Sequence, residues 1–349
     1  MKENILVTGA SGFVAENLIP ELISKNYSVY GVDRKSKPSA RCTNFISKDI
    51  VDLETDFLIE NNISKVIHLA AARADWGIQD DEFIHDNVTA SKALIACIKN
   101  SAVKDVIFVS SISVMPQASH DVIDETAPYD PINIYGETKK KAELLFIDLF
   151  NQELNQLNLT IIRPTVLYGP SNPNNTGMYR AVDNNIFRLI DGIYSNRFAI
   201  VGDGNTVKTT AYVKNFVDSI LFSLERSQGY KLYVYADHPP LIMKDLVTII
   251  RTKLKKKGDG LKLPFIIIRP ISKLLDILSK ITKINFPITQ ARIDTFVRPT
   301  NFRPTNLIND GFKQRTDTNE ALNKTIEWYL DLKQNHKNNF FLFKDGIEK

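Results

Sequence analysis

Two side chains with complementary acid–base chemistry stand four residues apart in Tyr135-Gly136-Glu137-Thr138-Lys139. That spacing places both of them on one face of a helix. A phenol, with an ordinary pKa of about 10, is a poor base at neutral pH, but a neighbouring ammonium stabilises its phenolate. Upstream, Ser110 and Ser111 end an apolar run, where a hydroxyl could bind a substrate oxygen. We therefore predict a proton-transfer site formed by Tyr135, Lys139 and a hydroxyl of this serine pair.

A glycine-rich turn near the N-terminus predicts a dinucleotide site. Gly9 permits a tight turn, and Gly12 lets backbone N–H groups approach a pyrophosphate at a helix N-terminus. Asp33 ends the second apolar run, where a carboxylate can accept hydrogen bonds from the adenosine ribose. This acid favours NAD over NADP, but Arg34 beside it could accommodate a 2′-phosphate, so the choice stays open. A structural turn with a capping aspartate is the alternative interpretation. The predicted cofactor-binding residues here are Gly9, Ser11, Gly12, Phe13, Val14, Asp33 and Arg34.

Short apolar runs alternate with helical patterns as far as about residue 165, which predicts an α/β fold. Continuous apolar strands between helices indicate a parallel sheet covered on both faces. We expect a doubly wound, Rossmann-type sheet whose ligand crevice lies at the carboxyl ends of its strands. The predicted strands contain residues 5–7, 29–32, 45–46, 66–69, 106–109 and 160–162.

The regular alternation of strand and helix patterns ends at a cluster of turn residues, 169–175. We expect a nucleotide-binding domain over 1–168 and a smaller, mostly helical substrate-binding domain over 169–335. An amphipathic helix within 205–225 is expected to pack back onto the first domain, and 336–349 forms a C-terminal tail.

Composition and charge limit the classes of protein to be considered. The chain has 349 residues, and 44 Lys and Arg against 40 Asp and Glu leave a net charge of only +4, which does not indicate a nucleic-acid binder. Two cysteines, Cys42 and Cys97, are too few for a disulfide framework or a zinc site and suit the reducing cytoplasm. No apolar run is long enough to span a membrane, and no metal site is predicted.

One apolar segment, 263–278, follows a group of lysines and permits two interpretations. It is either a peripheral membrane patch or lid beside a lipid-linked substrate, or a buried helix that caps the substrate domain.

In combination, these motifs resemble the extended short-chain dehydrogenase/reductase superfamily, specifically its NAD-dependent nucleotide-sugar epimerase/dehydratase branch. The resemblance covers about residues 3–330. It rests on the segments 8–13, 48–50, 68–71, 110–111, 135–139, 163–170, 201–204, 212–215 and 326–329, together with Asp33 and Asn87.

The resemblance implies roles for further residues. It makes Ser111, Tyr135 and Lys139 the catalytic triad, with Tyr135 and Lys139 also touching the cofactor. Ser111, Tyr135, Thr165 and Lys208 would contact the substrate, with Lys208 directed toward the phosphates of a sugar nucleotide or, alternatively, a surface lysine. The residues implied to line or support the cofactor are Asp49, Ile50, Leu69, Ala70, Ala71, Asn87, Ser110, Pro164 and Val166.

Departures from the family pattern narrow the expected reaction. Where 4,6-dehydratases of this branch carry Asp-Glu, this chain has Ile112-Ser113, so water elimination is disfavoured. We expect a cytoplasmic, homodimeric nucleotide-sugar 4-epimerase that uses NAD, by resemblance in surface-polysaccharide synthesis. Two alternatives stay open: a net NAD(P)-dependent dehydrogenase or ketoreductase of a sugar or sterol-like alcohol, and a catalytically idle dinucleotide-binding protein.

Overall fold

The computed structural model of the chain describes residues 2–73, 79–117, 119–153, 156–173, 181–182, 184–264, 266, 268, 270 and 297–335. Most of the 263–278 segment and the whole 336–349 tail, for which the sequence raised specific expectations, lie outside these residues. None of the described helices is long and apolar enough to cross a membrane.

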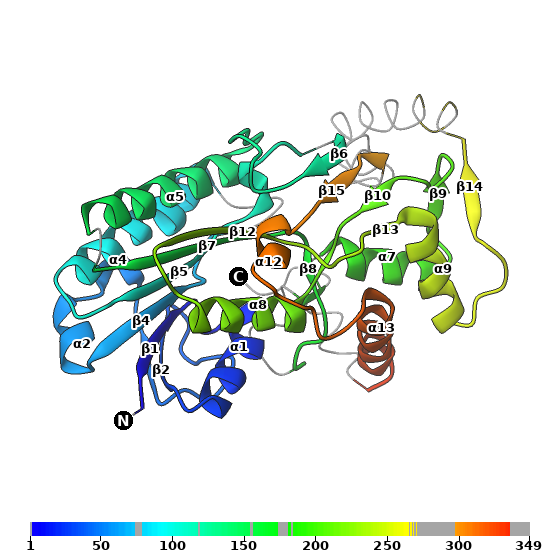
Figure 1. Cartoon of the computed structure of the whole chain (residues 1–349). Coiled ribbons are helices and arrows are strands. Elements are labelled where there is room, and N and C mark those ends of the chain that lie inside the picture. The colour runs from blue at the N-terminus through cyan, green and yellow to red at the C-terminus, as the bar shows by residue number, and fades with distance from the viewer. Residues whose placement is uncertain are drawn as a thin grey trace.

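A seven-stranded parallel sheet forms the larger part of the molecule (Figure 1). Its order, β12-β7-β5-β4-β1-β2-β3, confirms the predicted doubly wound α/β fold. All six predicted strands are present, whereas the edge strand β12 was not predicted. The central strands are buried on both faces, so Ile5, Leu6 and Val7 are all fully inaccessible. The strands are β1 (Asn4–Thr8), β2 (Ser28–Asp33), β3 (Asn44–Ser47), β4 (Ile63–His68), β5 (Asp105–Val109), β7 (Asn158–Pro164) and β12 (Tyr230–Tyr235).

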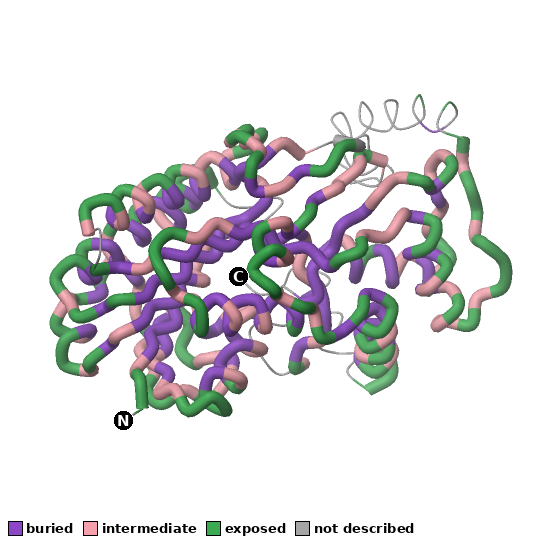
Figure 2. The backbone as a smooth tube through the Cα atoms, viewed as in Figure 1, coloured by how far each residue is buried: buried purple, intermediate pink, exposed green. Residues whose placement is uncertain are grey.

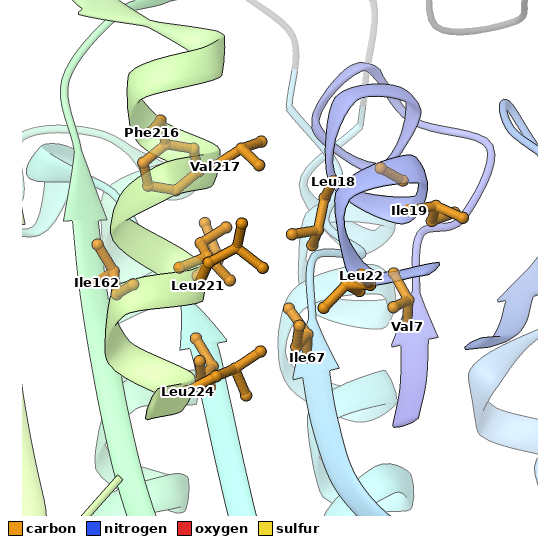
Figure 3. Close-up of a cluster of buried hydrophobic side chains, with 14 of the residues drawn as sticks. Val7, Leu18, Ile19, Leu22, Ile67, Ile162, Phe216, Val217, Leu221 and Leu224 are labelled. Atoms are coloured by element: carbon orange, nitrogen blue, oxygen red, sulfur yellow. The ribbon is translucent and has the colours of Figure 1, made fainter. Parts of the chain in front are cut away.

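Helices cover both faces of this sheet. On one face α1 (Phe13–Ser24) and α8 (Val213–Glu225) pack against each other through leucines such as Leu18 and Leu221 (Figure 3). The other face carries the apolar sides of α4 and α5, with Leu94 and Phe146 fully buried. The helical elements on and around that face are η1 (Ile50–Asp52), α2 (Thr55–Glu60), α3 (Asp80–Phe83), the π-helical turn η2 (Ile84–Thr89), α4 (Ala90–Lys99), η3 (Ile112–Val114) and α5 (Ile134–Gln152).

Beyond the carboxyl end of the sheet lies a second, smaller assembly. Its core joins the buried residues of α7 (Asn185–Tyr194), α9 (Met243–Lys253) and α13 (Thr318–Asn335). Figure 2 shows along the chain which residues are buried. The other elements are β6 (Ser119–Ile123), β8 (Leu167–Tyr168), β9 (Ala199–Val201), β10 (Val207–Lys208), β11 (Ala211–Tyr212), β13 (Leu241–Ile242), β14 (Leu261–Leu263), β15 (Thr300–Phe302) and α12 (Thr305–Asn309). Short sheets, β13-β10-β15-β6 foremost, tie this region together.

The strand order reverses direction between β1 and β4, which are neighbours in the sheet. In an open α/β sheet, ligands bind outside the carboxyl ends of the strands at such a switch point. The fold therefore places the site where β1, β4 and β5 end and where the smaller assembly faces them.

Candidate active site

A cavity of about 1000 Å³ opens at this switch point. Most of the residues predicted from the sequence meet on its walls, although they come from segments as far apart as the first turn and β7. The predicted residues that line it are Gly9, Gly12, Phe13, Val14, Asp33, Arg34, Asp49, Ile50, Leu69, Ala70, Ala71, Ser110, Ser111, Tyr135, Lys139, Pro164, Thr165 and Val166. Three others lie elsewhere: Ser11 and Asn87 are buried behind the wall, and Lys208 lines a second cavity.

The turn after β1 is shaped for close approach to a ligand. Gly9 has φ +70°, and a Cβ atom there would lie 2.8 Å from the backbone nitrogen of Ala70. Gly12 is the N-cap of α1 and supplies no side-chain cap, so the helix begins with N–H groups available at the cavity. A dinucleotide pyrophosphate fits this arrangement, since the helix N-terminus favours an anion.

The carboxylate that ends β2 is oriented by the same turn. Asp33 accepts a hydrogen bond of 3.0 Å from the backbone N–H of Ser11 and another of 3.0 Å from that of Lys35. Ser11 in turn donates its hydroxyl to the carbonyl oxygen of Lys37 at 2.7 Å. Ser11 therefore holds the shape of the loop instead of reaching into the cavity.

The start of α5 sets the positions of the Tyr135 and Lys139 side chains. Asn133 caps the helix by accepting the N–H of Gly136 at 2.8 Å. A Cβ atom on Gly136 would lie 2.2 Å from the carbonyl oxygen of Ser113, so only glycine lets α5 contact the segment after β5. In that segment Ser111 accepts the N–H of Ser113 at 3.1 Å, which fixes its hydroxyl on the cavity wall.

Lys139 is almost completely buried. Its ammonium donates to the carbonyl oxygen of Val109 at 2.8 Å and lies 4.2 Å from the centre of the Phe108 ring. Burial lowers the pKa of Lys139 to about 7, while Glu143 opposes that shift. His68, bonded to the Thr8 hydroxyl at 2.6 Å, has its pKa lowered to about 3 by burial and by Lys139, so its ring is neutral.

Asn87 connects the cavity wall to the catalytic helix from behind. Its carboxamide accepts the N–H of Ala72 at 2.9 Å and donates to the hydroxyl of Thr138 at 3.0 Å. Thr138 donates to the carbonyl oxygen of Tyr135 at 3.0 Å. This chain of bonds joins the loop after β4 to the residues that carry the proposed chemistry.

Two buried hydroxyls on the cavity wall have no hydrogen-bond partner among the residues that the structure describes. They are Ser110 Oγ, just after β5, and Thr165 Oγ1, just after β7. Buried polar groups normally find a hydrogen-bond partner, so these two are suited to a bound ligand. Together with the glycine turn and Asp33, they fit a dinucleotide cofactor.

A second cavity of about 410 Å³ adjoins the first. Lys208 is its most buried cation: it donates to the carbonyl oxygen of Arg298, and burial lowers its pKa to about 8. Sequence reasoning missed Asn185, Gln117 and Arg298 in this wall, because none stands in a recognised motif. The Asn184-Asn185 pair, which caps and begins α7, was the available signal. The apolar lining comprises Ile112, Ile132, Val166, Ile186, Leu189, Met243 and Leu246.

Comparisons with known proteins agree with this geometry. The model of the NAD dependent epimerase/dehydratase family matches residues 5–235. The N-acetyl-alpha-D-glucosaminyl-diphospho-ditrans,octacis-undecaprenol 4-epimerase of Escherichia coli O157:H7 is 30% identical over 94% of this chain and 96% of its own length. A solved complex of MoeE5 with UDP-glucuronic acid and NAD has a TM-score of 0.72 and 25% identity, covering 94% of this chain and 99% of that one. UDP-N-acetylglucosamine 4-epimerase from Methanobrevibacter ruminantium M1 shares the fold, with a TM-score of 0.71 and 22% identity over 95% and 99% of the two chains.

Proposed function

Because the chain belongs to the NAD dependent epimerase/dehydratase family, we propose that it is an NAD-dependent 4-epimerase of nucleotide sugars. One observation carries the proposal: a single cavity is lined by the glycine turn and Asp33 at one end and by Ser111, Tyr135 and Lys139 at the other. The net dehydrogenase alternative has less support, because two of the three relatives described above are named as 4-epimerases.

The chain's own residues would position the sugar and move its proton. A bound NAD would supply reversible hydride transfer at C4 of the sugar. The Ser111 hydroxyl would hold the C4 oxygen, and Tyr135 would take its proton and later give it back. The Lys139 ammonium would stabilise the phenolate that this transfer requires. Gly9, Gly12 and Asp33 would hold the cofactor.

A second candidate substrate, a sugar diphosphate carried on a polyprenol, is favoured by the second cavity. Lys208 and Arg298 supply positive charge for a diphosphate, and most of the remaining wall is aliphatic. The Escherichia coli relative is named for such a substrate. In both candidates the sugar diphosphate is the shared chemistry, and the group beyond it differs.

An NMR assay separates these possibilities. Purified protein is incubated without added cofactor with UDP-N-acetylglucosamine or with N-acetylglucosaminyl diphosphate on a short polyprenol, and the axial C4 epimer is followed. We expect epimer formation with no net change in the nicotinamide absorbance. Tyr135→Phe should lower kcat at least about 10³-fold while leaving NAD binding intact. Stoichiometric NADH release, or full activity of Tyr135→Phe, would contradict the mechanism.

We also propose a cytoplasmic homodimer built on α4 and α5, and two domains divided at residue 168, except that β12 belongs to the large sheet of the first domain and α8 packs on that sheet. Leu144 on α5 is 47% exposed, so a charge can be placed there to test this interface without disturbing the core. Cys42 and Cys97 are free thiols, which suits a reducing compartment. Sedimentation of the wild type and of Leu144→Glu tests the dimer, and cell fractionation tests the location, with binding to membranes through 263–278 as the opposite outcome.

A further inference from the structure

The adenosine end of the cavity contains an ion pair that the cofactor motif does not require. Arg34, directly after β2, places its guanidinium 2.5 Å from the carboxylate of Asp86 and 3.9 Å from that of Asp49. All three residues line the cavity with Asp33. The Arg34 side chain is 59% exposed, but that of Asp86 is only 14% exposed, so the pair is anchored on its acidic side.

We propose that Asp86 is a cofactor-specificity residue that keeps Arg34 from binding the 2′-phosphate of NADP. An arginine near the end of this strand is the group that accommodates a 2′-phosphate in NADP sites. The Asp86 carboxylate occupies the Nη2 end of the Arg34 guanidinium and offsets its positive charge, so fewer donors and less charge are left for a phosphate. Asp33 would repel that phosphate, and the Asp86–Arg34 pair weakens the neighbouring cation that could compensate.

The local backbone explains how Asp86 reaches Arg34. Residues 84–89 form the π-helical turn η2, whose wider winding is often found at functional sites. Consecutive residues of this turn serve two ends of the cavity. Asp86 pairs with Arg34 after β2, and Asn87 bonds to Ala72 after β4.

Other polar and charged side chains at this corner define the controls. His85 contacts Asp86 at 2.9 Å, and Lys48, also on the cavity wall, pairs with Glu54 at 3.3 Å. Lys48 is another cation of the cavity wall that a 2′-phosphate could meet, and its removal is tested separately.

The test measures the dissociation constants of NAD and NADP by competition on the full-length protein. In Asp86→Asn we expect the affinity ratio to shift about tenfold toward NADP, a change of about 1.4 kcal/mol. Asp81→Asn, which removes the same charge from the exposed start of α3, should leave the ratio unchanged. Arg34→Ala in the Asp86→Asn background should return the ratio to the wild-type value, whereas Lys48→Ala in that background should not.

Three results would overturn the proposal. If Asp86→Asn lost affinity for NAD and NADP equally, with an unchanged circular dichroism spectrum, Asp86 would have only a structural role. A shift that survives Arg34→Ala would mean that Asp86 acts through its own charge. An unchanged ratio would show that Arg34 does not select the cofactor. The inference rests on NAD binding at this site, and failure of the wild type to bind either dinucleotide would instead refute the proposed function.

Discussion

Replacing Thr138 with valine tests whether the bonds behind the cavity position the catalytic helix. Valine keeps the shape of threonine and removes only the hydroxyl, which accepts from Asn87 and donates to the carbonyl oxygen of Tyr135, each at 3.0 Å. Thr138 is fully buried and Asn87 is 1% exposed, so water cannot replace the lost partner. An unsatisfied buried donor costs about 1–3 kcal/mol, which is the expected loss in the free energy of unfolding.

The catalytic effect should exceed what the loss of stability alone produces. Lys139 is the next residue along α5, and Ala72 is held by the same amide, so both ends of the chain of bonds shift together. Misplacement of catalytic groups by about 1 Å can cost about 10²-fold in rate, and a partial shift should cost about tenfold in kcat. Steady-state kinetics and urea unfolding on the same preparations give the two quantities.

Two matched variants decide the interpretation. Thr325→Val removes a buried hydroxyl that donates to Ala321 on α13, far along the chain from the cavity, and should reduce stability by about 1 kcal/mol without lowering kcat. Thr138→Ser keeps the hydroxyl and should retain most of the activity. If Thr138→Val is less stable yet turns over at the wild-type rate, the chain of bonds has no positioning role.

Two further predictions concern a strained glycine and a buried carboxylate. Gly9→Ala forces φ +70° on an L residue and brings its Cβ to 2.8 Å from the backbone nitrogen of Ala70, so it should weaken NAD binding and lower the free energy of unfolding by about 1–3 kcal/mol. The control Gly229→Ala, with φ +62° and no atom within 4 Å of the new Cβ, should lower stability only; urea unfolding and NAD titration measure the two effects. Asp237 is buried against Tyr212, Asn215 and Tyr235, and burial raises its pKa to about 6, so the native state binds its proton more tightly than the unfolded state. Its contribution to stability therefore declines as pH rises from about 4 through 6. Urea unfolding from about pH 4 to about pH 7 should show the stability gap between wild type and Asp237→Asn changing over that range, and a constant gap would contradict the reasoning.

The residues that sequence reasoning located are those whose function follows from short spacing. Gly9 and Gly12 sit within one turn, and Tyr135 and Lys139 within one helical turn, so local geometry predicts their neighbourhood. The resemblance gave Asn87 the role of supporting the cofactor-side helix and its hydrogen-bond network, and its carboxamide bonds to Ala72 and Thr138 behind the cavity wall. No local sequence pattern shows whether a side chain on such a buried turn points into the cavity or away from it.

Features that depend on distant pairing were not predicted. Arg34 meets Asp86 across 52 positions in the chain, and the π-helical turn that brings them together has no sequence signature among ordinary helical spacings. The division of the site into two cavities, with Lys208 in the second, likewise depends on how the smaller assembly packs at the sheet's edge. The edge strand β12 was missed because its alternation of Tyr, Lys, Leu and Val is typical of many half-buried segments.

Two opposing effects set the charge of Lys139. Burial lowers the pKa of its ammonium, and the Glu143 carboxylate, one helical turn later on α5, raises that pKa in part. Glu143 is itself bound to Arg163 at 2.6 Å and to the Tyr129 hydroxyl at 2.7 Å, so it acts on Lys139 through space and forms no ion pair with it. In the proposed mechanism, Glu143 therefore helps to keep Lys139 in the ammonium form that would stabilise a phenolate.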